Sequence, residues 1–118
     1  MNNMVSIENI TYVTISGQRQ YTIEVSDGES NLVIGLPLGK LDRSIVINTI
    51  IRCKYSQDAV EAIINNHFIN ISEWIDLKFK GEEVEFSDPD YEALQQWRAV
   101  SKELATLILE NIERIESK

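Results

Sequence analysis

The residues best suited to chemistry are the single histidine, His67, and the single cysteine, Cys53. A histidine in this position can serve as a general base, or as a metal ligand together with Glu61 or Asp76. A zinc site needs three or four Cys, His or carboxylate ligands, and one His with one Cys falls short of that number. We therefore expect His67 to be a partly buried histidine on a helix face beside Phe68, hydrogen-bonded to the backbone.

Cys53 would become a nucleophile if Arg52, Lys54 or His67 lowered its pKa. A free cysteine more often serves as a small buried hydrophobic residue, and Cys53 falls on the apolar face of its segment. We expect that structural role. A lone cysteine also excludes a disulfide within the chain, which is typical of a reducing, cytoplasmic setting.

Residues 35–40, Gly-Leu-Pro-Leu-Gly-Lys, invite comparison with a phosphate-binding loop. The segment lacks the spacing of that motif, and Leu41 follows the lysine where the motif has Ser or Thr. We interpret it as a connector between a strand and a helix. Acidic residues gather in two groups without the spacing of a calcium loop, and we interpret them as a solvated face: Glu82, Glu83 and Glu85, and Asp88 and Asp90. No cofactor or metal is predicted.

Charge and length restrict the class of protein. The 118 residues suit a single domain, residues 1–118, and carry 11 basic and 19 acidic side chains with a net charge of −8. Phosphate backbones and anionic membranes select for clustered Lys and Arg, so nucleic-acid and membrane binding are not expected. Residues 1–4 include no basic segment, and no apolar stretch follows them, so no secretory signal is predicted.

Alternating apolar and polar residues predict strands in two parts of the chain. Residues 10–26 form an expected hairpin that turns at Gly17-Gln18, and residues 32–34 suit a third strand. Residues 75–87 alternate in the same way around Gly81-Glu82 and predict a second hairpin. Lys78 and Lys80 would then lie opposite two glutamates on its wet face.

Helical spacing of apolar residues predicts three helices. Residues 42–55 fit a strand or a helix, and their length with Asp42 as N-cap favours a helix. A second helix starts after Ser56 and weakens near Asn65-Asn66. The last and longest helix starts with Asp88 as N-cap and Pro89 at its first position, and runs for roughly 27 residues without Gly or Pro.

Three apolar residues are candidates for an interaction surface: Trp74, Phe79 and Leu107. Trp74 follows a polar stretch, and an exposed tryptophan near Phe79 is a typical binding hot spot, although a core position is the alternative. Leu107 widens the apolar stripe of the last helix beyond what one neighbour would cover. The pair of helices at 43–68 also resembles a helix-turn-helix arrangement, but its outward face is acidic and would repel phosphate.

Together these patterns predict an α+β fold, with an antiparallel sheet of two hairpins (four or five strands) packed against three helices, the C-terminal one long. The function that fits best is a non-catalytic protein–protein interaction or assembly module, acting on a protein partner or as a homodimer through the last helix. One alternative is a small enzyme or ligand-binding protein with a site near His67, Cys53, Tyr55 and Glu61. Another is an acidic regulator that binds a basic partner.

Overall fold

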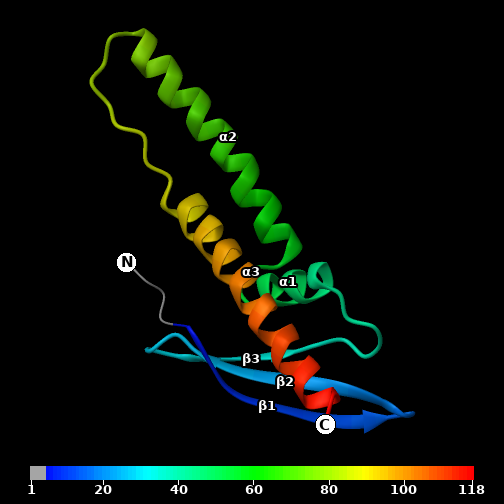
Figure 1. Ribbon diagram of the computed structural model, residues 1–118. Coiled ribbons are helices and arrows are strands. Elements are labelled where there is room, and N and C mark those ends of the chain that lie inside the picture. Colours follow the sequence, from blue (N-terminus) through cyan, green and yellow to red (C-terminus); the bar gives the residue numbers. More distant parts are fainter. Residues whose placement is uncertain (1–4) are drawn as a thin grey trace.

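The computed structural model describes residues 5–118 and shows an elongated α+β molecule of 64 × 28 × 20 Å (Figure 1). The expectation of no secretory signal rests partly on residues 1–4, which lie outside the described residues. The elements follow in the order β1 (Ser6–Ile15), β2 (Gln18–Ser26), β3 (Asn31–Gly35), α1 (Arg43–Arg52), α2 (Gln57–Phe79) and α3 (Pro89–Glu116).

The sheet confirms the predicted first hairpin and third strand. β2 lies in the centre and pairs antiparallel with β1 and β3, with Tyr12 opposite Tyr21 and Ile23 opposite Ile34. The turn lies at Ser16-Gly17, one residue earlier than expected, and both residues have positive φ (51° and 81°). Two successive left-handed residues are what a two-residue hairpin turn needs to match the twist of its strands.

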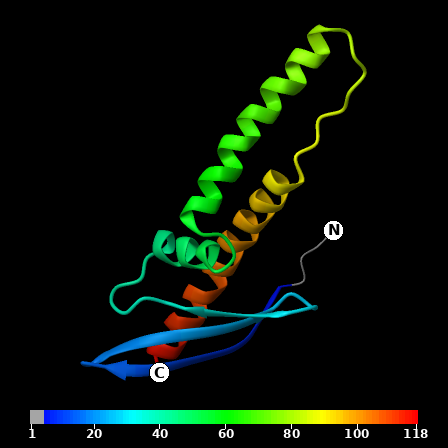
Figure 2. The same cartoon turned by 180° about the vertical axis from the view of Figure 1, so that it is seen from behind.

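The core lies between one face of this sheet and the helices α1 and α3 (Figure 2). Ile23 and Ile34 point from the sheet, Ile50 from α1, and Leu104 and Ile108 from α3, and all five are almost fully buried. The Tyr21 hydroxyl donates to Glu116 Oε2 at 2.9 Å, which ties the centre of the sheet to the end of α3. The apolar stripe of the last helix is therefore used mainly inside the molecule.

The predicted starts of the three helices are confirmed. Asp42 accepts a hydrogen bond from the Ile45 N–H at 2.9 Å, so the ambiguous segment is helical, as favoured. Ser56 accepts from the Ala59 N–H at 3.1 Å, and Asp88 accepts from the Tyr91 N–H at 3.4 Å. Each bond satisfies one of the N–H groups that a helix start leaves without a partner.

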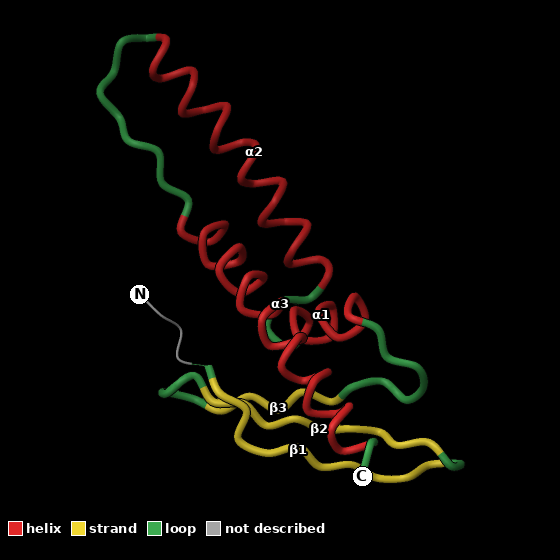
Figure 3. Tube along the Cα trace, viewed as in Figure 1, coloured by secondary structure: helices red, strands yellow, loops and turns green. Residues whose placement is uncertain are grey.

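The second hairpin was predicted wrongly. Within residues 5–118 the sheet has three strands, not four or five, because residues 75–79 continue α2 and residues 80–88 form an extended connection (Figure 3). Gly81, with φ +83°, is not a hairpin turn but the residue that ends the helix. Its N–H bonds the Lys78 carbonyl and the Glu82 N–H bonds the Leu77 carbonyl, the pair of bonds that closes a Schellman motif.

The expectation that three helices cover one face of the sheet also needs correction. α1 and α3 cover it, whereas α2 projects away from the sheet beside the first turns of α3 and the extended connection (Figures 1 and 2). The helix does not weaken at Asn65-Asn66 but runs unbroken for 23 residues. We call α2 together with residues 80–88 the arm.

Candidate interaction surface

α2 differs from the other two helices because none of its 23 residues is buried. Both of the other helices bury several apolar side chains, three on α1 and six on α3 alongside Ser101. Isolated helices gain little stability from propensity alone, and most helical stability in proteins comes from packing one apolar face. Since α2 buries no residue, its stability has to come from contacts of partly exposed side chains, while other apolar residues of the helix are left exposed.

One side of α2 is attached to the start of α3 by hydrogen bonds. His67 Nδ1 lies 2.8 Å from Asp88 Oδ2, and the Asn70 side-chain amide donates to the same oxygen at 3.2 Å. The His67 and Asp88 side chains are only 13 % and 7 % exposed. Because a carboxylate only accepts, the Nδ1–H of His67 is the donor. These bonds, first that of His67, lower the pKa of Asp88.

Aromatic rings extend the same attachment in both directions. The His67 ring stacks on Tyr91 with centroids 3.5 Å apart and planes within 6°. Farther along α2, Trp74 Nε1 donates to the Val84 carbonyl at 3.1 Å, and its ring packs edge-on against Phe86. We call His67, Asn70 and Trp74 the inner face of α2, because they hold the extended connection and the start of α3 against the helix.

The side of α2 next to the inner face carries a row of apolar residues that we call the outer stripe: Ile64, Phe68, Ile71, Ile75 and Phe79. Their spacing of three or four residues places them on one side of the helix. Phe68 is 63 % exposed, Ile75 is 43 % exposed and Phe79 is 87 % exposed. Ile64 and Ile71 are half-buried. Large apolar residues that gather in this way on one surface are typical of interaction sites.

The predicted interaction residues lie in different places. Phe79 is exposed at the tip of the arm, and Trp74 is half-buried on the inner face, where it contacts its own chain. Leu107 is exposed on α3, on the main body. Of these three candidates, only Phe79 belongs to the outer stripe. Sequence reasoning missed Ile64, Phe68, Ile71 and Ile75 as a set, since the predicted helix was too short to show their alignment.

The candidates for a ligand or catalytic site are not gathered in one pocket. His67 lies on the inner face, and Glu61 is exposed on α2, where it accepts from the Gln57 side chain at 2.8 Å. Cys53 is half-buried at the end of α1; its Sγ lies 3.3 Å from the Thr49 carbonyl, and burial raises its pKa. A raised pKa leaves the thiol mostly neutral, so the thiolate that a nucleophile needs is scarce.

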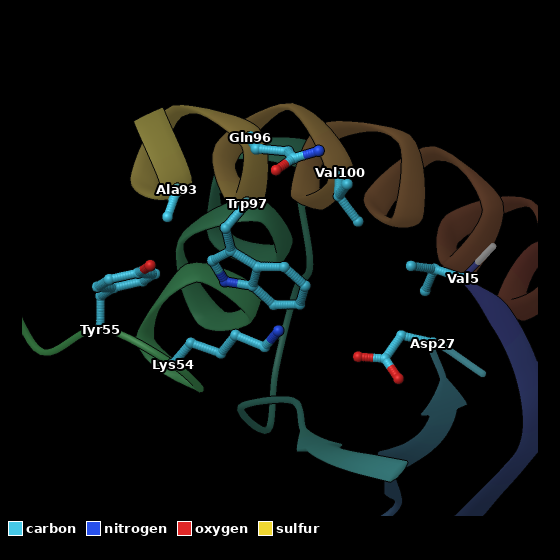
Figure 4. A pocket seen from close by; sticks show the side chains of 8 residues that line it. All are labelled: Val5, Asp27, Lys54, Tyr55, Ala93, Gln96, Trp97 and Val100. Atoms are coloured by element: carbon cyan, nitrogen blue, oxygen red, sulfur yellow. The ribbon is translucent and has the colours of Figure 1, made fainter. Parts of the chain in front are cut away.

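Tyr55 lines a small hollow between the C-terminal end of α1, the β2–β3 turn and α3 (Figure 4). Lys54 extends under the Trp97 ring, with Nζ 4.2 Å from the ring centroid, toward Asp27. The N–H groups of Ser30 and Glu29 bond Asp27 and lower its pKa. The hollow measures about 200 Å³, which is below the roughly 300–1,000 Å³ typical of small-molecule sites.

Within residues 5–118, no three His, Cys, Asp or Glu side chains come together in a way that would hold a metal ion. Among the helices of the described part of the chain, none combines the length and apolar character that crossing a bilayer requires. Comparison of the chain with protein-family models, curated proteins and solved structures found no match.

Proposed function

We propose that the protein is a non-catalytic interaction module that binds another protein through the outer stripe of α2. One observation carries this proposal: a helix of 23 residues buries none of them and yet displays Phe68, Ile75 and Phe79 to solvent. Covering such residues is favourable by roughly 25 cal/mol for each Å² of apolar surface removed from water. A protein partner would supply the cover that the chain itself does not.

The contacts of the inner face support this interpretation. His67 and Trp74 already fix the helix to the connection and to α3, so the fold does not require the outer stripe for its own packing. The arm presents the stripe as a pre-formed surface. Pre-formed surfaces bind at a lower entropic cost than segments that fold on binding.

The open face of the sheet is a weaker candidate. Val13 and Val33 are exposed there, but Gln20 lies opposite Val13 and Glu24 lies opposite Val33 in the strand pairing. Apolar residues that are separated by polar neighbours are normal on protein surfaces. The outer stripe is continuous, and this favours it as the contact surface.

The two alternatives have less support. The ligand-binding alternative rests on the hollow beside Tyr55, which is small, and on His67, which is engaged with Asp88 and Tyr91. The alternative of an acidic regulator is supported only by the net charge of −8. Salt-sensitive binding to a basic protein, unchanged by substitutions in the outer stripe, would favour the regulator over the interaction proposed here.

The proposal can be tested by placing a photoreactive phenylalanine analogue at position 75 or at position 73 of the full chain in its native cells. Glu73 is a matched control because it is exposed on the same helix but lies on the side opposite the outer stripe. We expect covalent adducts with another protein chain, including a second copy, at position 75 and few at position 73. Equal, low yields at both positions would refute the proposal.

A further inference from the structure

The outer stripe has a symmetry that points to its partner. Ile64, Phe68, Ile71 and Ile75 follow one another at intervals of four, three and four residues, which is the spacing of a helix that packs along another helix. Glu61 comes three residues before this set and Lys78 comes three residues after it. The pattern is apolar in the middle, acidic at one end and basic at the other.

We infer that the partner is a second copy of this chain, whose α2 packs antiparallel on the first along the outer stripe. This inference rests on the proposed function and names the partner for the same surface. In the symmetric arrangement Ile64 lies opposite the partner's Ile75, and Phe68 lies opposite the partner's Ile71. A two-fold dimer requires one patch that is complementary to itself, and this stripe meets that requirement.

The charges select the antiparallel direction. In this register Glu61 lies opposite the partner's Lys78, and the symmetry repeats the pair at the other end of the contact. A parallel dimer would place Glu61 beside Glu61 and Lys78 beside Lys78, which is unfavourable. Both side chains are exposed, so they are accessible to a partner: Glu61 bonds only Gln57 in the described chain, and Lys78 Nζ lies 6.0 Å from the Trp74 ring.

The charges also select the register. A shift by one heptad in one direction would place Lys78 against the partner's Phe68, and a shift in the other direction would place Glu61 against the partner's Ile71. Either shift buries a charge among apolar side chains, which is costly. The exposed residues Asn65 and Ser72, which flank the stripe on the side away from the inner face, are uncharged and add no repulsion.

The shape of the molecule permits this arrangement. The arm projects away from the sheet (Figures 1 and 2). Phe68, Ile75 and Phe79 of the outer stripe are exposed to solvent, and Ile64 and Ile71 are half-buried. Antiparallel arms place the two sheets at opposite ends of the dimer. Phe79, at the tip of one arm, then reaches the level of the partner's Val60, near the base of the other arm.

The test is a charge exchange followed by sedimentation equilibrium over a range of concentrations. Each of Glu61→Lys and Lys78→Glu replaces two attractive pairs per dimer by two repulsive ones, so the dissociation constant should rise on the order of ten-fold. The double variant Glu61→Lys with Lys78→Glu should return the dissociation constant to within about two-fold of the wild-type value. Glu73→Lys, which makes the same charge change on the opposite side of α2, should have no comparable effect.

The outcomes separate this inference from the proposed function. A chain that stays monomeric at high micromolar concentration but forms adducts with a different protein from position 75 would overturn the second-copy inference and leave the interaction module standing. A dimer whose double variant is not restored would overturn the antiparallel register. A chain that stays monomeric and forms no adduct at position 75 would refute both the second-copy inference and the proposed function.

Discussion

His67 Nδ1 lies 2.8 Å from Asp88 Oδ2, so a residue in the middle of α2 is bonded to the residue that caps α3. The two residues are 21 positions apart, and Asp88 also accepts from Asn70 and from the Tyr91 N–H. One carboxylate therefore starts the longest helix and holds the arm. It connects the part of the molecule that forms the core with the part that we propose forms contacts.

This arrangement predicts a loss of stability in acid. Because His67 in particular lowers the pKa of Asp88, the unfolded chain takes up the proton first as the pH falls. The stabilising contribution is complete above the ordinary aspartate pKa of about 3.9 and disappears as the pH falls through the lower folded value. Between pH 5 and pH 2, the melting temperature should therefore fall further in the wild type than in Asp88→Asn. Parallel curves for the two proteins would contradict this account of Asp88.

The indole of Trp74 should hold the extended connection, residues 80–88, against α2. In Trp74→Phe the ring contact with Phe86 is kept in part, but the hydrogen bond to the Val84 carbonyl is lost. A neutral hydrogen bond contributes about 1 kcal/mol, so cleavage within residues 82–88 by a glutamate-specific protease should accelerate roughly five-fold. Cleavage at Glu24 in the sheet serves as the internal control. An unchanged cleavage rate in the connection would show that Trp74 does not hold it.

Adjacent residues of α3 provide a test of the core. Ile108 is fully buried, whereas Leu107 is 44 % exposed. Ile108→Ala should lower the free energy of unfolding by about 2–5 kcal/mol, while Leu107→Ala should change it by no more than about 0.5 kcal/mol. Denaturant titration of both variants measures the difference. Similar losses of stability in the two variants would mean that α3 does not direct Ile108 into the core and Leu107 toward solvent.

Cys53 should react slowly while the protein is folded. Burial raises the pKa of its thiol. In an assay at about pH 7.5, a smaller fraction of Cys53 is therefore thiolate than in a free cysteine. Alkylation by iodoacetamide should therefore be slower in the native protein than in the urea-unfolded chain under the same buffer. A native rate that matches or exceeds the unfolded rate would revive the nucleophile hypothesis for this residue.

The parts of the fold that could be predicted from the sequence are those in which local pattern and packing agree. Tyr21, Ile23 and Val25 alternate because one face of β2 covers the core, and Asp88-Pro89 marks a helix start by its own chemistry. The alternation in residues 75–87 suits a hairpin, but residues 75–79 belong to α2, which places Ile75 and Phe79 in the outer stripe. A glycine such as Gly81 can end a helix or turn a hairpin, and local sequence does not distinguish these roles.

The candidate surface was predicted only in part. Phe79 was a candidate interaction residue, but its relation to Phe68 and Ile75 appears only once α2 is known to be continuous. The partner of His67 could not be derived, because no local pattern connects residues 21 positions apart. The expectation of a backbone partner for His67 was wrong for the same reason, since its contact is the Asp88 carboxylate.

The most direct test of the central claim, that a second copy covers the outer stripe, is the melting temperature measured over a hundred-fold range of protein concentration. Association that favours the folded state should raise the wild-type melting temperature by about 2–3 °C for each tenfold increase in concentration. Phe68→Gln, in an exposed residue of the stripe, should remove this dependence, whereas Val13→Gln on the open sheet face should retain it. A wild-type melting temperature independent of concentration would contradict the claim.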